Sequence, residues 1–176
     1  MKRIAVIVGA WVMLAVPLGA SAQTPRPSEI PPVITSTAPF GTGKLSRLLI
    51  VAYDAALWTD AKAWSYGAPF ALSLRYHMGF ESADLVDRTI DEMKGQGTLT
   101  PSDEAEYRQQ LAKAFPDVKD TDRITAVYVP PRTVQFYYNG TPTHTVNDAT
   151  FAPRFFDIWL SEKTSEPSLR KALLSR

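Results

Sequence analysis

Apolar and polar residues alternate most regularly between Phe70 and Met78. Every second position in this stretch is apolar or aromatic, and smaller or polar residues stand between them. A period of two predicts a half-buried β-strand. The stretch from Lys44 to Trp58 is also rich in Leu, Ile, Val and Tyr. We interpret it as two short strands, or as one strand with a bend near residues 54–56.

Two more strands are expected in the second half of the chain, at residues 123–129 and 133–138, on either side of Pro130-Pro131. Asn139-Gly140 follows the second of them directly. Asn-Gly between apolar runs is the strongest short-range signal for a β-hairpin, because both central residues of its turn need a positive φ. Residues 133–138 should therefore pair with residues 141–146.

Four segments carry apolar residues at helical spacing, at residues 82–94, 100–115, about 147–160 and 167–174. Ser82 is the expected N-cap of the first helix, with Gly95 or Gly97 as its stop. Pro153 lies inside the third, which is therefore kinked or begins later. Strands, two helices, antiparallel strands and then helices predict an α+β fold, in which an antiparallel sheet has one face covered by helices.

The first 40 residues follow a different pattern. Two basic residues, an uncharged and mostly apolar run of 13 residues and then Ala20-Ser21-Ala22 predict a signal peptide at residues 1–22, which places the mature protein in the periplasm or outside the cell. The run is shorter than the roughly 20 residues of a membrane-spanning helix, although an uncleaved anchor is the alternative. Residues 23–40 hold five of the 14 prolines and predict a stiff, extended lead-in, with packed structure beginning near Gly41.

Composition narrows the possible functions. Removal of residues 1–22 leaves 154 residues, enough for one domain, here residues 41–176 with its lead-in. The remaining 17 basic and 18 acidic residues give a net charge of −1 without a dense basic cluster, which argues against a nucleic-acid partner. Two histidines and no cysteines argue against a metal site. The sequence also lacks the G-x-S-x-G motif of serine hydrolases and a phosphate-binding loop, and no motif in it indicates a cofactor.

Two arginines are the candidate binding groups. Arg75 lies within the predicted strand, opposite its apolar face, and Arg88 lies on the helix that follows. An Arg in the middle of a strand is usually solvated or ion-paired, and the neighbouring acids Asp84, Asp87 and Asp91 are local partners for Arg88. The alternative is that the two guanidinium groups, with Tyr53 or Tyr128, form a polar spot in an apolar cleft. Arg suits such a site because it binds a carboxylate through two parallel hydrogen bonds.

Several segments, taken in order, resemble the bacterial chalcone isomerase-like family over nearly all of residues 41–175. They are residues 51–58 (VAYDAALW), 70–76 (FALSLRY), 87–93 (DRTIDEM), 114–118 (AFPDV), 122–125 (DRIT), 136–140 (FYYNG) and 155–160 (FFDIWL). The resemblance implies the chalcone isomerase fold, an open-faced β-sandwich in which helices are layered on one face of an antiparallel sheet. Some relatives are isomerases that close a chalcone to a flavanone, and others bind fatty acids without catalysis.

The resemblance supports the fold better than it supports an enzymatic activity. The enzymes have an Arg in their first strands, and residues 28–45 contain none. The position of their catalytic Thr holds Leu48, their Tyr falls near residues 80–81, and their helix Asn corresponds to Arg88. Only their late Ser or Thr has a counterpart, Ser165. The catalytic residues, if there are any, are therefore unknown.

Three functions stay open. The leading hypothesis is an exported, non-catalytic protein that binds a small apolar or fatty-acid-like carboxylate ligand through Arg75, Arg88, Tyr53, Tyr128 and Ser165. The alternative is an isomerase, an intramolecular lyase that acts on a chalcone-like unsaturated carbonyl compound. The third is an interaction module whose cleft is filled by its own side chains. In each case we expect no stable membrane anchor after cleavage.

Overall fold

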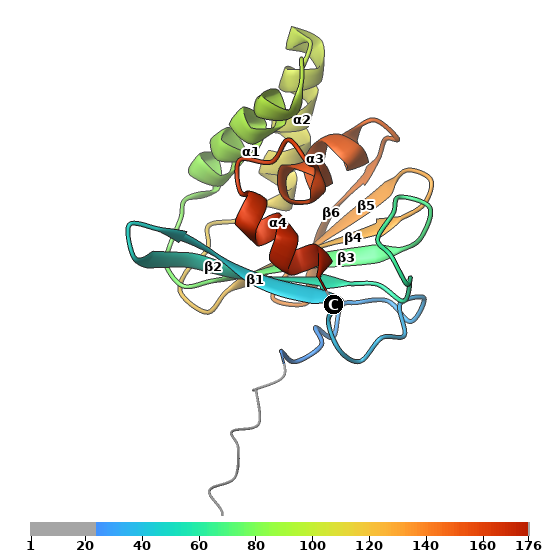
Figure 1. Ribbon diagram of the computed structural model, residues 1–176. Coiled ribbons are helices and arrows are strands. Elements are labelled where there is room, and N and C mark those ends of the chain that lie inside the picture. Colours follow the sequence, from blue (N-terminus) through green and yellow to red (C-terminus); the bar gives the residue numbers. More distant parts are fainter. Residues whose placement is uncertain (1–23, 176) are drawn as a thin grey trace, which may run out of the picture.

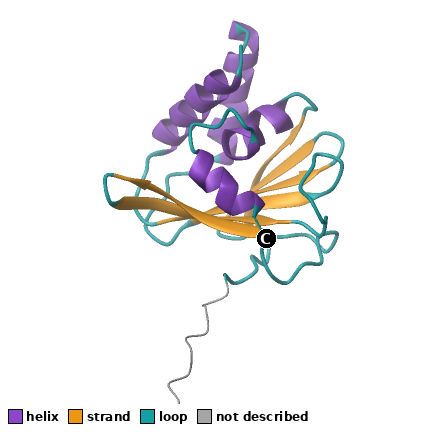
Figure 2. Cartoon of the chain, in the orientation of Figure 1, coloured by secondary structure: helices purple, strands orange, loops and turns teal. Residues whose placement is uncertain are grey.

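A computed structural model describes residues 24–175 of the chain (Figures 1 and 2). The elements, in order, are β1 (Gly41–Arg47), β2 (Ile50–Trp58), β3 (Phe70–Tyr76), α1 (Ser82–Gln96), α2 (Pro101–Ala114), β4 (Arg123–Val129), β5 (Thr133–Tyr138), β6 (Thr141–Asn147), α3 (Phe151–Leu160) and α4 (Pro167–Leu174). The predicted signal peptide at residues 1–22 lies outside the described residues.

The six strands form one sheet in sequence order, β1-β2-β3-β4-β5-β6, and every neighbouring pair is antiparallel. Helices α1 and α2 are inserted between β3 and β4, and α3 and α4 follow β6. All four helices lie on the same side of the sheet (Figure 1). The predicted α+β class, an open-faced sandwich with helices layered on one face, is confirmed.

The first hairpin turns at a place that the sequence does not mark. β1 and β2 are two strands, but the turn between them is Leu48-Leu49, with Arg47 paired to Ile50. The bend expected near residues 54–56 is wrong, because these residues pair regularly with β1 and β3. Neither Leu is a turn-forming residue, so local composition gives no signal for this turn.

The second two-residue turn is the one that the sequence predicts. β5 pairs with β6, and Tyr138 is opposite Thr141. Asn139 and Gly140 form the turn between them with φ of 48° and 88°. The predicted Asn-Gly hairpin is therefore confirmed, with both central residues at positive φ.

The helices begin and end close to the predicted residues, but the N-cap of α1 is not the predicted one. The side chain of Ser82 does not cap α1, whose N-cap residue is Glu81. Instead Asp117 accepts a hydrogen bond of 2.7 Å from the Ser82 amide. α2 begins as expected, with a capping box between Thr100 and Asp103.

Among the described residues, no helix is both long enough and apolar enough to cross a membrane.

The main core lies between the sheet and the helices. One side chain in two along β3 and β4 faces the helices, including Phe70, Leu72 and Ala126. α3 is apolar around most of its circumference and contributes Phe151, Phe155 and further aromatic residues, which meet mainly edge to face. Because the strand side chains alternate, the residues between them leave the sheet on its other face.

The lead-in covers part of that other face. Residues 24–40 contain no helix or strand, but Ile30 and Ile34 are buried in a second apolar cluster with Trp58 and Ala71. The expectation that packed structure begins near Gly41 is therefore wrong. Proline-rich composition indicated an extended segment, but it did not reveal that two isoleucines of this segment would find an apolar surface on the sheet.

Candidate functional site

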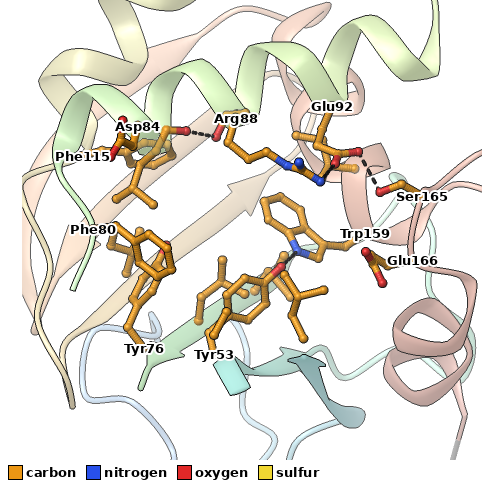
Figure 3. A pocket seen from close by; sticks show the side chains of 18 of the residues that line it. Tyr53, Tyr76, Phe80, Asp84, Arg88, Glu92, Phe115, Trp159, Ser165 and Glu166 are labelled. Carbon is orange, nitrogen blue, oxygen red and sulfur yellow. Dashed lines mark hydrogen bonds and ion pairs between the residues drawn. The ribbon is translucent and has the colours of Figure 1, made fainter. Parts of the chain in front are cut away.

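A cavity of about 640 Å³ lies between the sheet and helices α1 and α3 (Figure 3). Its walls come from β1, β2, β3 and β4 on one side and from the two helices on the other. Most of the lining side chains are apolar or aromatic, and they include Leu72, Leu74, Tyr76, Phe80, Phe155 and Ile158. The cavity exists because strand residues that face the helices are not all met by helix side chains.

Charged residues gather along one edge of this cavity. Arg88 is the only basic residue of the described lining, beside the acidic residues Asp84, Glu92 and Glu166. Arg88 Nη2 donates to Glu92 Oε1, and Ser165 Oγ donates to Glu92 Oε2 over 2.8 Å. The side chain of Glu92 is 14% exposed, whereas that of Arg88 is 62% exposed. Arg88 is thus held by Glu92 and also accessible from outside.

A second polar contact lies deeper in the cavity. Trp159 Nε1, on α3, donates to the hydroxyl oxygen of Tyr53, on β2, over 2.9 Å (Figure 3). Burial of the phenol raises the pKa of Tyr53 to about 12, although the hydrogen bond from Trp159 acts in the opposite direction. Tyr53 is therefore neutral at physiological pH, and a neutral phenol can donate its proton in a hydrogen bond to a ligand oxygen.

Three of the five predicted site residues line the cavity, namely Tyr53, Arg88 and Ser165. Arg75 does not, so the structure does not bring Arg75 and Arg88 together in the polar spot that was expected from the sequence. Arg75 pairs in register with Asp54 and Arg123, and it is exposed on the face of the sheet away from the helices. The alternation of β3 requires this, because the neighbouring residues Leu74 and Tyr76 face the cavity.

Tyr128 also lies outside the cavity lining. It faces the helices, but Tyr66 and Phe70 pack against its ring, and its hydroxyl donates to the Pro131 carbonyl over 3.2 Å. The loop between β2 and β3 brings Tyr66 over this part of the sheet, a contact that strand periodicity does not predict. Tyr128 therefore belongs to the packed core.

The partners of Tyr53 and Arg88 in the cavity, Trp159 and Glu92, were not predicted as site residues. Trp159 lies on α3 among other aromatic residues, and nothing in the sequence distinguishes it from a core residue. Glu92 could have been found, because it lies four residues after Arg88, a spacing at which oppositely charged side chains meet on a helix. The acids expected to pair with Arg88 included Asp87, but Asp87 pairs with Arg108 instead.

Neither histidine lies in the cavity. His77 Nε2 lies 2.8 Å from a carboxylate oxygen of Asp54, and His144 bonds to Gln110. Within residues 24–175 there is no group of three or more His, Cys, Asp or Glu side chains that could hold a metal ion. The cavity offers an apolar chamber with an Arg, three carboxylates, a Ser and a neutral phenol at its polar positions, which suits recognition of an apolar molecule with a polar group.

Comparisons with known proteins agree with this fold. A sequence model described as chalcone isomerase-like matches residues 41–175. No curated protein matches the chain. Among solved structures, a fatty-acid binding protein from Arabidopsis thaliana is similar, with a TM-score of 0.60 and 14% sequence identity over 78% of this chain and 86% of that one. At this identity the similarity concerns the fold.

Proposed function

Because the chain belongs to the chalcone isomerase-like family, whose fold it shares with a fatty-acid binding protein, we propose that it binds a small apolar ligand without transforming it. The observation that carries the proposal is the apolar cavity of about 640 Å³ between sheet and helices. Binding sites for small molecules have volumes of roughly 300–1,000 Å³ and apolar walls with a few polar groups. The cavity fits this description.

The proposed ligand is a fatty-acid-like carboxylate whose chain lies against the sheet and whose head group meets Arg88. The guanidinium can exchange its contact with Glu92 for a ligand carboxylate, because Arg88 is accessible and offers two parallel N–H groups. Ser165 can hold Glu92 during this exchange, since its hydroxyl already bonds the other oxygen of that carboxylate. Glu92 is then the internal competitor of the ligand.

The test compares a long-chain carboxylic acid with the alcohol of the same chain length. Arg88→Met keeps much of the apolar stem and removes the charge, so it should weaken binding of the acid about tenfold or more, the scale of a lost charged hydrogen bond. Binding of the alcohol should change little. Glu92→Gln removes the competing charge and should strengthen binding of the acid. Isothermal titration calorimetry and the shift in melting temperature measure both effects.

The same experiment can overturn the proposal. If acid and alcohol respond equally to both variants, Arg88 is only a surface ion-pair residue. If neither ligand raises the melting temperature, the cavity is not a site for such molecules. If an unsaturated ketone such as chalcone is turned over and Arg88→Met removes that rate, the isomerase alternative replaces the binding protein.

We further propose that the protein is exported, because the sequence of residues 1–22 has the pattern of a signal peptide. A ligand-binding protein of the periplasm or the extracellular space would then begin at Gln23. N-terminal sequencing of the protein outside the cytoplasm should read Gln-Thr-Pro, and an intact Met1 would contradict cleavage.

A further inference from the structure

The tip of the β1–β2 hairpin exposes three consecutive apolar side chains. Leu48 is 96% exposed, Leu49 is completely exposed and Ile50 is 60% exposed. Single exposed apolar residues are common on protein surfaces, but contiguous ones mark contact sites for proteins or membranes. In Figure 1 this hairpin extends past the helix layer at the edge of the molecule, so no described element covers its tip.

The backbone of this tip is unfavourable for the residues that form it. Leu48 and Leu49 have φ of 47° and 72°. A two-residue turn with both φ values positive favours Asn-Gly, and the Asn139-Gly140 turn of this chain has that sequence. Leu clashes with its own backbone at positive φ. A turn that keeps two leucines at the expense of stability points to a role for their side chains.

The position of the tip indicates what that role is. Leu48 and Ile50 line the cavity as well as being exposed, and so does Met78, beyond the end of β3. The exposed apolar surface is therefore continuous with the cavity wall, and together these residues form the mouth of the cavity. A molecule that moves between the cavity and an apolar phase at the tip would not need to cross water.

We propose that the tip formed by Leu48, Leu49 and Ile50 inserts into the surface of a lipid bilayer. Three side chains on a narrow hairpin offer far less area than the roughly 800 Å² per partner that a stable protein interface buries. They suit shallow, reversible insertion at the boundary between headgroups and acyl chains, where affinity follows the apolar area buried. The proposed membrane contact depends only on the exposure and backbone conformation of the tip. The idea that a ligand enters the cavity from the membrane rests in addition on the proposed function.

The experiment uses the absence of cysteine from the full chain. Leu49→Cys gives one attachment point for an environment-sensitive fluorophore at the tip, and Val33→Cys gives a matched exposed apolar position on the lead-in. With phosphatidylcholine vesicles and no other ligand, the label at 49 should become brighter and blue-shifted, and brominated acyl chains should quench it. The label at 33 should not respond, which separates the tip from any contact made by the N-terminal apolar run.

A second pair of variants tests the role of the leucine. A label at Ser46→Cys, further back on the same hairpin, should respond more weakly than the label at 49. Adding Leu49→Gly should reduce the vesicle affinity reported by that label about tenfold, the scale of one large apolar side chain. This variant should not lower the melting temperature, because Gly tolerates positive φ.

Two results would overturn the proposal. In the first, the labels at 49 and 33 respond alike to vesicles. In the second, the label at 49 responds to protein concentration without lipid, which would mean that a second copy of the chain covers the tip. Since no cavity ligand is present in these measurements, failure of the membrane contact is distinguishable from failure of the binding function.

Discussion

The two faces of the sheet are covered in different ways. On one face four helices lie across the strands and leave a cavity of about 640 Å³. On the other face an irregular segment packs Ile30 and Ile34 against Trp58 and Ala71, and all four side chains are nearly completely buried. Rigid helices can therefore leave space above a sheet, whereas an extended segment can follow its surface closely.

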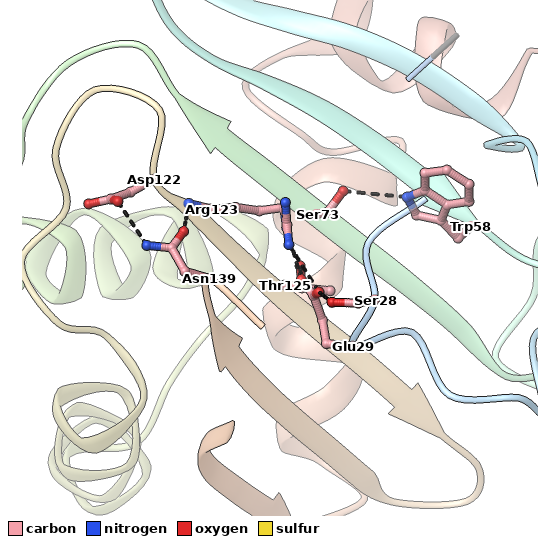
Figure 4. A network of polar contacts seen from close by, with 8 residues as sticks. All are labelled: Ser28, Glu29, Trp58, Ser73, Asp122, Arg123, Thr125 and Asn139. Atoms are coloured by element: carbon pink, nitrogen blue, oxygen red, sulfur yellow. Dashed lines mark hydrogen bonds and ion pairs between the residues drawn. The ribbon is translucent and has the colours of Figure 1, made fainter. Parts of the chain in front are cut away.

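The covered face is also fixed by a charge. The side chain of Glu29 is completely buried and bonds to Arg123 Nε at 2.9 Å and to Thr125 Oγ1 at 2.7 Å (Figure 4). Burial alone would raise the pKa of Glu29, but the hydrogen bonds from Arg123 and Thr125 outweigh it and hold the pKa below its usual value of 4.5. One ionised group on the lead-in thus ties it to the sheet.

The largest expected effect comes from breaking this tie. Glu29→Ala leaves Arg123 without its carboxylate and should lower the free energy of unfolding by about 3 kcal/mol, the low end for a buried pair, because Arg123 stays partly exposed. Glu162→Ala, at an exposed carboxylate 3.9 Å from Arg170, should have little effect. Urea denaturation at pH 7 measures both variants, and equal losses would mean that the lead-in is not anchored by this pair.

The pH dependence of that loss tests its electrostatic origin. The pKa of Glu29 is lowered in the folded state, so its stabilisation is complete above the unfolded value of about 4.5 and is lost as the pH falls through the folded value. The difference in stability between the native chain and Glu29→Ala should therefore shrink below about pH 4.5. A difference independent of pH would assign the loss to packing.

A smaller change in stability should distinguish the sheet face covered by the lead-in from the face that borders the cavity. Ala71 and Ala126 are both buried, on β3 and β4 respectively, but Ala71 faces the lead-in and Ala126 lines the cavity. Ala71→Leu should cost about 1–3 kcal/mol through overpacking, whereas Ala126→Leu can extend into the cavity and should cost less than about 1 kcal/mol. Ala126→Leu should also weaken ligand binding. Equal losses of stability would mean that the cavity cannot accept these atoms.

The smallest effects, of opposite sign, are expected at the two tight turns. Gly140→Ala should lower stability by about 1 kcal/mol, because Ala is strained at positive φ. The nearest atom to an added Cβ is Ser28 Oγ, at 3.5 Å, so no clash contributes. Leu49→Gly relieves the same strain and should raise stability by up to about 1 kcal/mol. Thermal unfolding measures both, and two losses would mean that the leucine turn is held by contacts that compensate its strain.

The sequence predicted those parts of the fold that carry a local signal. Alternation located β3, and Asn139-Gly140 located the last hairpin, because each depends on neighbouring residues alone. The Leu48-Leu49 turn was missed since it lacks any turn-forming residue, and this shifted the expected break to residues 54–56. The packing of Ile30 was missed because its partners are on strands that come much later in the chain.

The site was also predicted only in part, because some of its residues carry a local signal in the sequence and others are brought together only by the fold. Arg88 and Ser165 come from the helix and loop that face the cavity; Arg88 was indicated by its place on the helix after β3, and Ser165 by the resemblance to relatives. Arg75 was assigned to the same site although the alternation of its strand placed it on the opposite face. Glu92 was overlooked although its distance from Arg88 along the helix is a local signal. Spatial neighbours such as Tyr66 over Tyr128 cannot be read from spacing.

The contact between Glu29 and Arg123 also has a consequence for the order of folding. The two residues are separated by 94 positions, so the lead-in, synthesised early, has to wait for β4 before its carboxylate can be paired. Contacts of such long sequence separation form late, because a large loop must close first. During synthesis from the N-terminus, the lead-in therefore cannot finish packing on the sheet until most of the strands have been made. The segment that is synthesised first is thus among the last to fold.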